Sequence, residues 1–264
     1  MNFLKKLFGP KEVKPVESGN TEIEVIATAT TEEDQVLEES GATEAEEPVV
    51  EPVEEPVKEI DFHILLDNGH AKSTPGKRMK LENGRFFYEY EFNRDVVKRI
   101  ADSLDELHIP YEILVPELEK DISLTDRAAR ANSFCTKYGK DKCLFISVHS
   151  NACGDGLTFN KAKGWSIYTT KGETKSDEIA TTFFNVADEE LPKYGFTTRK
   201  DITDGDPDYE ENFTVIYKTW CPAVLTENLF FTNKEEVKWL MSEEGKQVIA
   251  DIHVKAIKKI VESK

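Results

Sequence analysis

Three stretches of this 264-residue sequence each place one chemically useful side chain directly after an apolar run. His70 ends the segment FHILLDNGH, His149 ends LFISVH, and Glu227 ends PAVLTE. Apolar runs of this length, bounded by turn residues, predict buried strands. Open α/β sheets build their sites at the carboxyl ends of their strands. Two imidazoles and a carboxylate at one such edge predict a metal site with a nearby acid or base.

Segments with helical periodicity separate these apolar runs. We predict helices at about 90–107, 123–138, 173–191, 233–241 and 243–262, and further strands at 111–115, 164–169 and 213–217. The polar, turn-rich segments 71–85 and 194–212 predict loops. Strands that alternate with helices of this length predict an α/β fold, with a single mostly parallel, mixed sheet and helices on both faces.

The charge is concentrated at the start of the chain. Residues 1–60 contain 16 acidic residues and 5 lysines, a net charge of −11, whereas the rest carries −6 of the total of −17. The early segment ends in a Glu/Pro/Val-rich run and has two aromatic residues, Phe3 and Phe8. Such a segment buries too little apolar surface to offset its ordering entropy. We therefore expect a disordered acidic segment over 1–59 and a folded domain over 60–264.

Composition also narrows the partners. The acidic balance argues against nucleic acid, whose affinity comes largely from lysine and arginine on phosphates. No segment is apolar for long enough to span a bilayer, and no signal-peptide core or cleavage site follows residues 1–9. Residues 1–9 are either an ordinary disordered start or a weak membrane-surface contact. The four cysteines show no C-x-x-C spacing and are expected to be reduced thiols.

Five motifs together carry a family resemblance. They are Leu66–His70 (LDNGH), Glu89-x3-Asn93, Asp126–Asn132 (DRAARAN), Ile146–Ala152 (ISVHSNA) and Pro222–Glu227 (PAVLTE). Their series resembles the zinc-dependent N-acetylmuramoyl-L-alanine amidases of the amidase-3 family, in the family's order and over residues 61–262. The set of five is far more specific than any one motif.

The resemblance implies roles for four residues. His70, Glu89 and His149 match the family's zinc ligands, for one Zn²⁺ per chain, and Glu227 matches its catalytic acid/base. It also implies that residues 60–264 are a zinc amidase catalytic domain. The substrate would be peptidoglycan, cleaved at the amide between N-acetylmuramic acid and L-alanine. Two neutral imidazoles and one carboxylate around an open fourth position are also a catalytic zinc arrangement on chemical grounds.

Other residues near these motifs have two interpretations each. Glu91 and Glu82 are alternatives to Glu89 as the third ligand, although Glu89 alone keeps the spacing to Asn93. Asn151 is a candidate for substrate binding, with a structural role in the turn as the alternative. Arg127 and Asp67 have the same ambiguity, Asp67 as a residue that orients a ligand. The remaining histidines, His63, His108 and His253, are interpreted as structural, and the Asp-rich stretch 201–208 as a solvated loop because it lacks EF-hand spacing.

Two departures from the family pattern affect the expected substrate groove. This chain has DNGHAK at residues 67–72, and Asn228 follows the expected catalytic glutamate where the family prefers glycine. The alternative functions are a zinc peptidase acting on stem-peptide bonds and a non-catalytic peptidoglycan-binding module. We expect a monomer that is made in the cytoplasm and acts on the cell wall, either as a phage-type lysin or after non-classical export.

Overall fold

A computed structural model describes residues 60–154 and 158–264. The segment expected to be disordered, 1–59, and the candidate membrane contact, 1–9, lie outside the described residues. No helix within the described ranges is both long and apolar enough to cross a membrane.

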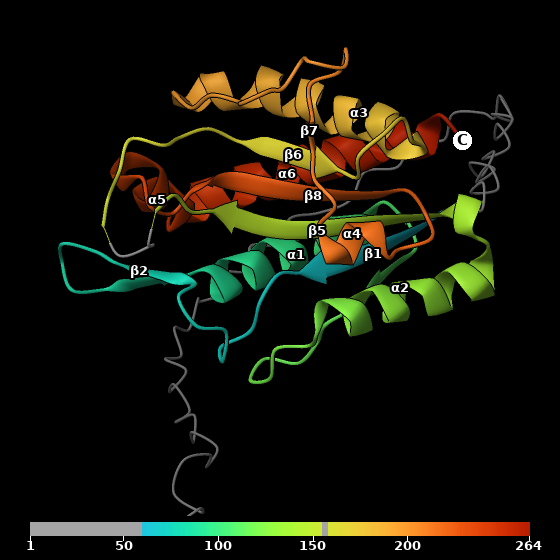
Figure 1. The fold of residues 1–264 in the computed structure, drawn as a ribbon, viewed down its shortest axis with the longest axis horizontal. Helices are drawn as coiled ribbons and strands as arrows, with labels where there is room; N and C mark the ends of the chain where they lie inside the picture. Colours follow the sequence, from blue (N-terminus) through green and yellow to red (C-terminus); the bar gives the residue numbers. More distant parts are fainter. Residues whose placement is uncertain (1–59, 155–157) are drawn as a thin grey trace, which may run out of the picture. The chain divides into compact units, whose positions relative to one another are not determined.

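A six-stranded sheet forms the centre of the fold, in the order β4-β1-β5-β8-β6-β7 (Figure 1). Its strands are β1 (His63–Asn68), β4 (Tyr111–Ile113), β5 (Cys143–Asn151), β6 (Ser166–Thr169), β7 (Tyr209–Glu210) and β8 (Ala223–Phe230). Neighbouring strands are parallel except β6, which runs antiparallel to β8. The predicted mixed, mostly parallel sheet is therefore confirmed.

Helices cover both faces of this sheet, as expected (Figure 1). They are α1 (Glu89–Glu106), α2 (Leu124–Tyr138), α3 (Lys175–Glu190), α4 (Thr214–Tyr217), α5 (Lys234–Leu240) and α6 (Glu243–Glu262), with short 3₁₀ helices η1 (Lys140–Lys142) and η2 (Leu191–Tyr194). The larger core packs α1, α3 and α6 against one face, and the smaller core packs α2 and α4 against the other. Ser123 caps α2 by accepting a hydrogen bond from the Asp126 N–H.

Three local predictions are wrong. Residues 213–217, expected to be a strand, contain the helix α4, whose Val215 and Ile216 are buried in the smaller core. Within the expected loop 71–85, the chain forms β2 (Arg78–Lys80), which pairs with β3 (Phe86–Tyr88) in an antiparallel hairpin. Part of the other expected loop becomes β7 at the edge of the sheet.

The alternation of side chains decides which residues face the α2/α4 side. Leu65 of β1, Phe145 of β5 and Leu225 of β8 all point into the smaller core on this side. Residues two positions further along a strand point the same way. His149 and Glu227 therefore lie on the α2/α4 side, near the carboxyl ends of parallel neighbouring strands. The fold brings the predicted site residues to one edge of the sheet.

Candidate active site

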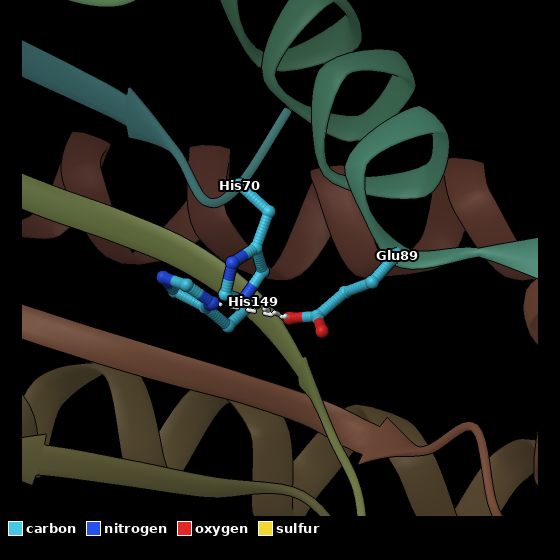
Figure 2. A group of neighbouring side chains, drawn as sticks. All are labelled: His70, Glu89 and His149. Atoms are coloured by element: carbon cyan, nitrogen blue, oxygen red, sulfur yellow. Dashed lines mark hydrogen bonds and ion pairs between the residues drawn. The ribbon is translucent and has the colours of Figure 1, made fainter. Parts of the chain in front are cut away.

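Three of the predicted side chains converge from three different elements (Figure 2). His70 follows β1, His149 lies on β5, and Glu89 begins α1. Their ligand atoms all lie within 4.8 Å of one another. Oε1 of Glu89 is 3.1 Å from Nδ1 of His149 and 3.3 Å from Nε2 of His70. This group of nitrogen and oxygen donors is able to hold a metal ion.

The turn after β1 holds His70 in place. His70 has a φ of 65°, in the left-handed region that most side chains avoid. Its carbonyl accepts a 2.8 Å hydrogen bond from Nη1 of Arg94, and the Gly69 carbonyl accepts a 3.0 Å bond from Nδ2 of Asn93. Both donors come from the first turns of α1, so the helix fixes the backbone of the turn. This contact accounts for Asn93 in the Glu-x3-Asn motif.

Gly69 makes room for the second histidine. A Cβ added at this position would lie 2.1 Å from Cε1 of His149, far inside contact distance. The His149 ring therefore packs directly against the backbone of the Gly69 turn. Glycine is required here for close approach, since Gly69 itself does not have a positive φ.

Glu89 is the most enclosed member of the group, with 1 % of its surface exposed. Its Oε1 also accepts a hydrogen bond of 3.3 Å from the Ser150 N–H. The backbone N–H of Glu89 donates to the Lys77 carbonyl, and Nζ of Lys77 lies 3.8 Å from Oε2. Sequence reasoning missed Lys77 because it precedes β2, in the segment predicted to be a loop.

The alternative ligands lie elsewhere. Glu91 is exposed and accepts a 2.9 Å hydrogen bond from the Tyr90 hydroxyl. Glu82 is exposed in the β2–β3 loop and pairs with Lys234 at 2.7 Å. Neither belongs to the group formed by the two histidines and Glu89.

Glu227 lies beside His149 in the sheet, since the two are paired residues of β8 and β5. The residue is half-buried, and its Oε2 is fully enclosed without a hydrogen-bond partner. Asn228, which departs from the family pattern, is fully buried on β8. Its Nδ2 donates to the His149 carbonyl at 2.9 Å, while its Oδ1 accepts from Nε1 of Trp165 at 2.7 Å. Asn228 therefore helps to fix the His149 backbone.

Burial shifts the pKa values of the site in different directions. Burial raises the pKa of Glu227 well above its ordinary value, and the negative charge of Glu89 adds to this effect. For Glu89, burial alone would raise the pKa, but the adjacent imidazoles of His149 and His70 outweigh this effect and lower it. Burial also lowers the pKa of His70, which favours the neutral imidazole that binds metals.

Several buried polar atoms around this group have no hydrogen-bond partner. They are Nε2 of His70, Oε2 of Glu89 and Oε2 of Glu227. Such atoms are rare in folded proteins and call for an ion, a water or a ligand. A metal ion between the imidazoles and Glu89 would satisfy the first two, so the donor set fits a metal.

Asp67 and Arg127 form a buried clamp beneath the site. The Asp67 carboxylate accepts 2.6 Å hydrogen bonds from Nη1 of Arg127 and from the Ser147 hydroxyl. Arg127 also donates to the Asn68 carbonyl at 3.1 Å, and its side chain is 2 % exposed. Arg127 is thus enclosed away from any substrate, and Asp67 holds α2 to β1 and β5 instead of contacting a histidine of the site.

The other candidates have local roles. Oδ1 of Asn151 accepts a 2.8 Å hydrogen bond from the Ala152 N–H, which leaves its amide group as the donor for a ligand. His63 stacks on Tyr138, His108 is exposed, and His253 is buried within α6. Across residues 60–154 and 158–264, His70, Glu89 and His149 are the only group of three that could hold a metal. All four cysteines are free thiols.

The fold and the residues at the sheet edge together define a class of enzyme. An α/β fold with a His–Glu–His group and a second carboxylate beside it fits a metal-dependent hydrolase. A family model described as N-acetylmuramoyl-L-alanine amidase (amidase-3) matches residues 64–259. The chain belongs to this amidase family, which is generally zinc-dependent. The resemblance read from the sequence is confirmed, and with it the enzyme class.

Two curated relatives are similar to the chain. The endolysin of Bacillus phage SPP1 is 28% identical over 208 residues, covering 76% of this chain and 66% of the relative. The N-acetylmuramoyl-L-alanine amidase CwlM of Bacillus licheniformis is 32% identical over 196 residues, covering 74% and 66%. The chain therefore spans about two thirds of the length of each relative.

Solved structures share the fold. An N-acetylmuramoyl-L-alanine amidase from Clostridium difficile 630 is 25% identical with a TM-score of 0.62, covering 77% of this chain and 98% of that one. The catalytic domain of CwlV from Paenibacillus polymyxa is 21% identical with a TM-score of 0.61, covering 77% and 99%. The latter likeness concerns the fold alone. The aligned part of this chain thus covers nearly the whole length of both solved structures.

Proposed function

We propose that this chain is a zinc-dependent amidase that hydrolyses the bond between N-acetylmuramic acid and L-alanine in peptidoglycan. One observation carries the proposal: His70, Glu89 and His149 converge within 4.8 Å, and Glu227 lies beside His149 on the next strand. Family membership supplies the reaction, since N-acetylmuramoyl-L-alanine amidases cleave this amide.

His70, Glu89 and His149 would hold the zinc. Two imidazoles and one carboxylate are a recurrent ligand set of catalytic zinc sites, which keep a further position open. When bound, zinc would polarise a carbonyl oxygen and make water a stronger acid. Gly69, Asn93 and Arg94 would keep the ligands at their spacing, because they fix the turn against which His149 packs.

Glu227 would move the protons of the reaction. Burial raises its pKa above the ordinary value, and its carboxyl group lies at the sheet edge that carries His149. As a base it would take a proton from the attacking water, and as an acid it would return it to the departing amine. Asn151 would donate its amide N–H to the substrate. Amide cleavage needs the second proton transfer because an unprotonated amine leaves poorly.

The biological setting of the proposal follows the phage relative. A protein similar to a phage endolysin is expected to be made in the cytoplasm and to act on the cell wall, as a phage-type lysin, with non-classical export as the alternative. We further propose that it acts as a monomer, with residues 60–264 as the catalytic domain.

Mass spectrometry of purified peptidoglycan digested by the zinc-loaded protein tests this function. We expect free stem peptides that begin with L-alanine, together with glycan fragments that have lost them. Cleavage inside the stem peptide would identify a peptidase instead, and binding without any product would identify a binding module.

Metal analysis of variants tests the ligands. His70→Ala and His149→Ala should lose bound zinc and turnover together, because each removes one of three protein ligands. Glu91→Ala is the matched control and should keep both, since Glu91 is exposed and bonded to Tyr90. Loss of zinc in Glu91→Ala, with full metal in Glu89→Ala, would contradict the assignment of Glu89.

A further inference from the structure

A row of residues extends from the metal ligands across the sheet. His149 of β5 pairs with Glu227 of β8, which in turn pairs with Ser166 of β6. On the side of β6 away from β8, Thr198 forms a parallel bridge to Trp165. Arg199, the next residue, is therefore level with Ser166. Figure 1 shows β6 between β8 and β7, at the side of the sheet where this row ends. Arg199 is thus the last member of a row that begins at His149.

Arg199 extends on the same face as Glu227. Tyr168, two residues after Ser166 in β6, packs on the smaller core and stacks with Tyr209, over whose ring the Arg199 guanidinium lies. A Cβ placed on Gly164 would lie 2.7 Å from Cγ of Arg199. The guanidinium group lies 5.2 Å from the ring centre of Phe230 and 5.5 Å from that of Tyr209. The backbone of Gly164 and the rings of Phe230 and Tyr209 fix the position of the Arg199 side chain.

The Arg199 cation has no acidic partner in the described part of the chain. It is half-buried, and it makes no ion pair within residues 60–154 and 158–264. Arg130 pairs with Glu117 and Arg99 with Asp95, each at 2.6 Å, whereas the exposed Arg78 and Arg85 also form no ion pair within the described residues. An arginine that is held in place beside aromatic rings, and unpaired in an acidic chain, is suited to bind an anion from outside.

The spacing indicates which anion. The backbones of neighbouring strands lie roughly 4.8 Å apart, so two such spacings separate the backbones of Arg199 and Glu227 by about 10 Å. An extended peptide advances at most about 3.3–3.6 Å per residue. In stem peptides, the residue after L-alanine is a glutamate joined through its side chain, whose backbone carboxyl group is free. The carbon of that carboxylate lies two residue lengths, at most about 7 Å, from the carbonyl carbon of the amide that is cleaved.

We infer that Arg199 binds the free carboxylate of the stem-peptide glutamate and so selects acidic stem peptides over amidated ones. This inference rests on the proposed function and adds to it a specificity-determining residue at the far side of the groove. Arg199 would present two parallel N–H groups to the carboxylate, a geometry that an amide cannot match. The acidic chain would repel an anion elsewhere on its surface, which makes a single fixed cation more selective.

The test compares two substrates that differ at one group. The zinc-loaded full chain is given muramoyl-peptides with either a glutamate carboxylate or the corresponding amide at the second residue. For Arg199→Gln, we expect KM for the carboxylate substrate to rise about 10- to 100-fold, with kcat within about threefold and bound zinc unchanged. KM for the amidated substrate should change by less than about threefold. Arg199→Lys should recover part of the loss, because it keeps the charge and loses the fork.

Arg85→Gln is the control variant, since Arg85 is an exposed arginine on the β2–β3 hairpin. It should leave both KM values unchanged. Equal losses on both substrates in Arg199→Gln, or no loss on either, would overturn the inference. If the unaltered protein cleaves neither substrate, the proposed function fails, and calorimetric titration with the two stem peptides decides the inference instead. Tighter binding of the carboxylate form that disappears in Arg199→Gln would support it, and equal binding would overturn it.

Discussion

Glu89 and Glu227 are two enclosed carboxyl groups at one site, and their surroundings push their pKa values apart. Glu89 accepts a hydrogen bond from His149, and its lowered pKa favours the ionised form that a metal ligand requires. Burial and the charge of Glu89 instead favour the protonated form of Glu227. Two carboxyl groups with separated pKa values commonly divide the roles of charged ligand and proton carrier. Metal binding at Glu89 and proton transfer at Glu227 can therefore be tested separately.

Glu227→Gln should reduce turnover and leave the metal in place. Glutamine keeps the shape of the side chain but has no basic oxygen, and general acid/base groups typically contribute about 10²- to 10⁴-fold in rate. We expect at least a hundredfold loss in kcat on soluble muramoyl-peptides, with unchanged zinc content by elemental analysis. An active variant would move the acid/base role to another group, and a zinc-free variant would make Glu227 a ligand.

Gly69→Ala should weaken metal binding although position 69 offers no ligand atom. The added methyl group would lie 2.1 Å from Cε1 of His149, so the ring must shift away from Glu89. Zinc titration against a competing chelator should show at least about a tenfold loss of affinity, comparable to the loss of a residue that orients a ligand. Gly84→Ala, where a Cβ meets nothing within 4 Å, should retain wild-type affinity and lose only backbone stability. Equal affinity in both variants would contradict this account.

At the scale of the element, α6 is tied to β8 through a buried histidine. His253 lies between the Ile249 carbonyl, 2.7 Å from its Nδ1, and the Thr226 hydroxyl, 2.9 Å from its Nε2. Burial lowers the pKa of His253 to about 4 from an ordinary 6.5. Between pH 6.5 and about pH 4, His253 is protonated in the unfolded chain but not in the folded one. The contribution of His253 to stability is therefore complete above pH 6.5 and is lost as the pH falls towards 4.

His253→Gln should flatten the dependence of stability on pH. Relative to the unaltered protein, the free energy of unfolding should fall less on going from pH 7 to pH 4, by roughly 3 kcal/mol. Urea unfolding at a series of pH values measures the difference, and the carboxylates common to both proteins cancel. His108→Asn is a suitable control, because His108 is exposed and its φ of 54° suits asparagine. Parallel curves for His253→Gln and the unaltered protein would contradict the prediction.

The elements that sequence analysis predicted correctly are those with a strong pattern. The run before His149 and the periodic face of α1 each have a length and spacing that only one element explains. Residues 213–217 failed because a five-residue apolar run has no period that separates a strand from a helical turn, and packing against α2 and β8 decided for the helix. The β2–β3 hairpin had a usable signal: Met79 and Phe87 alternate with polar or exposed neighbours around Asn83-Gly84.

The site itself was predictable in its residue types but not in its supports. Histidines and glutamates at strand ends are visible as motifs, and the structure brings His70, Glu89 and His149 together. Lys77, Arg94 and Asn228 were not predicted to contact the site, because their roles depend on side chains that reach across elements. Such contacts are set by the path of the folded chain, and no local spacing encodes them.

At the scale of the whole molecule, a chain that begins at Ile60 should be sufficient for catalysis. All the proposed ligands, Glu227 and Arg199 lie beyond this point, and the family match begins at residue 64. We expect the truncated protein to unfold cooperatively, bind zinc and turn over soluble muramoyl-peptides within about threefold of the full chain. Circular dichroism, metal analysis and kinetics on both proteins measure this. Failure of the shorter chain to fold would show that the acidic segment contributes to the domain.

The outermost strands of the main sheet have a consequence for behaviour in concentrated solution. β4 has three residues and β7 has two, whereas the central strands β5 and β8 have nine and eight. A long, unpaired outer strand would offer a row of free N–H and C=O groups on which a second chain could build a continuous sheet. Here the row at either side is only a few groups long, and the net charge of −17 adds mutual repulsion between copies. The protein is thereby suited to accumulate at high concentration without assembling into fibres.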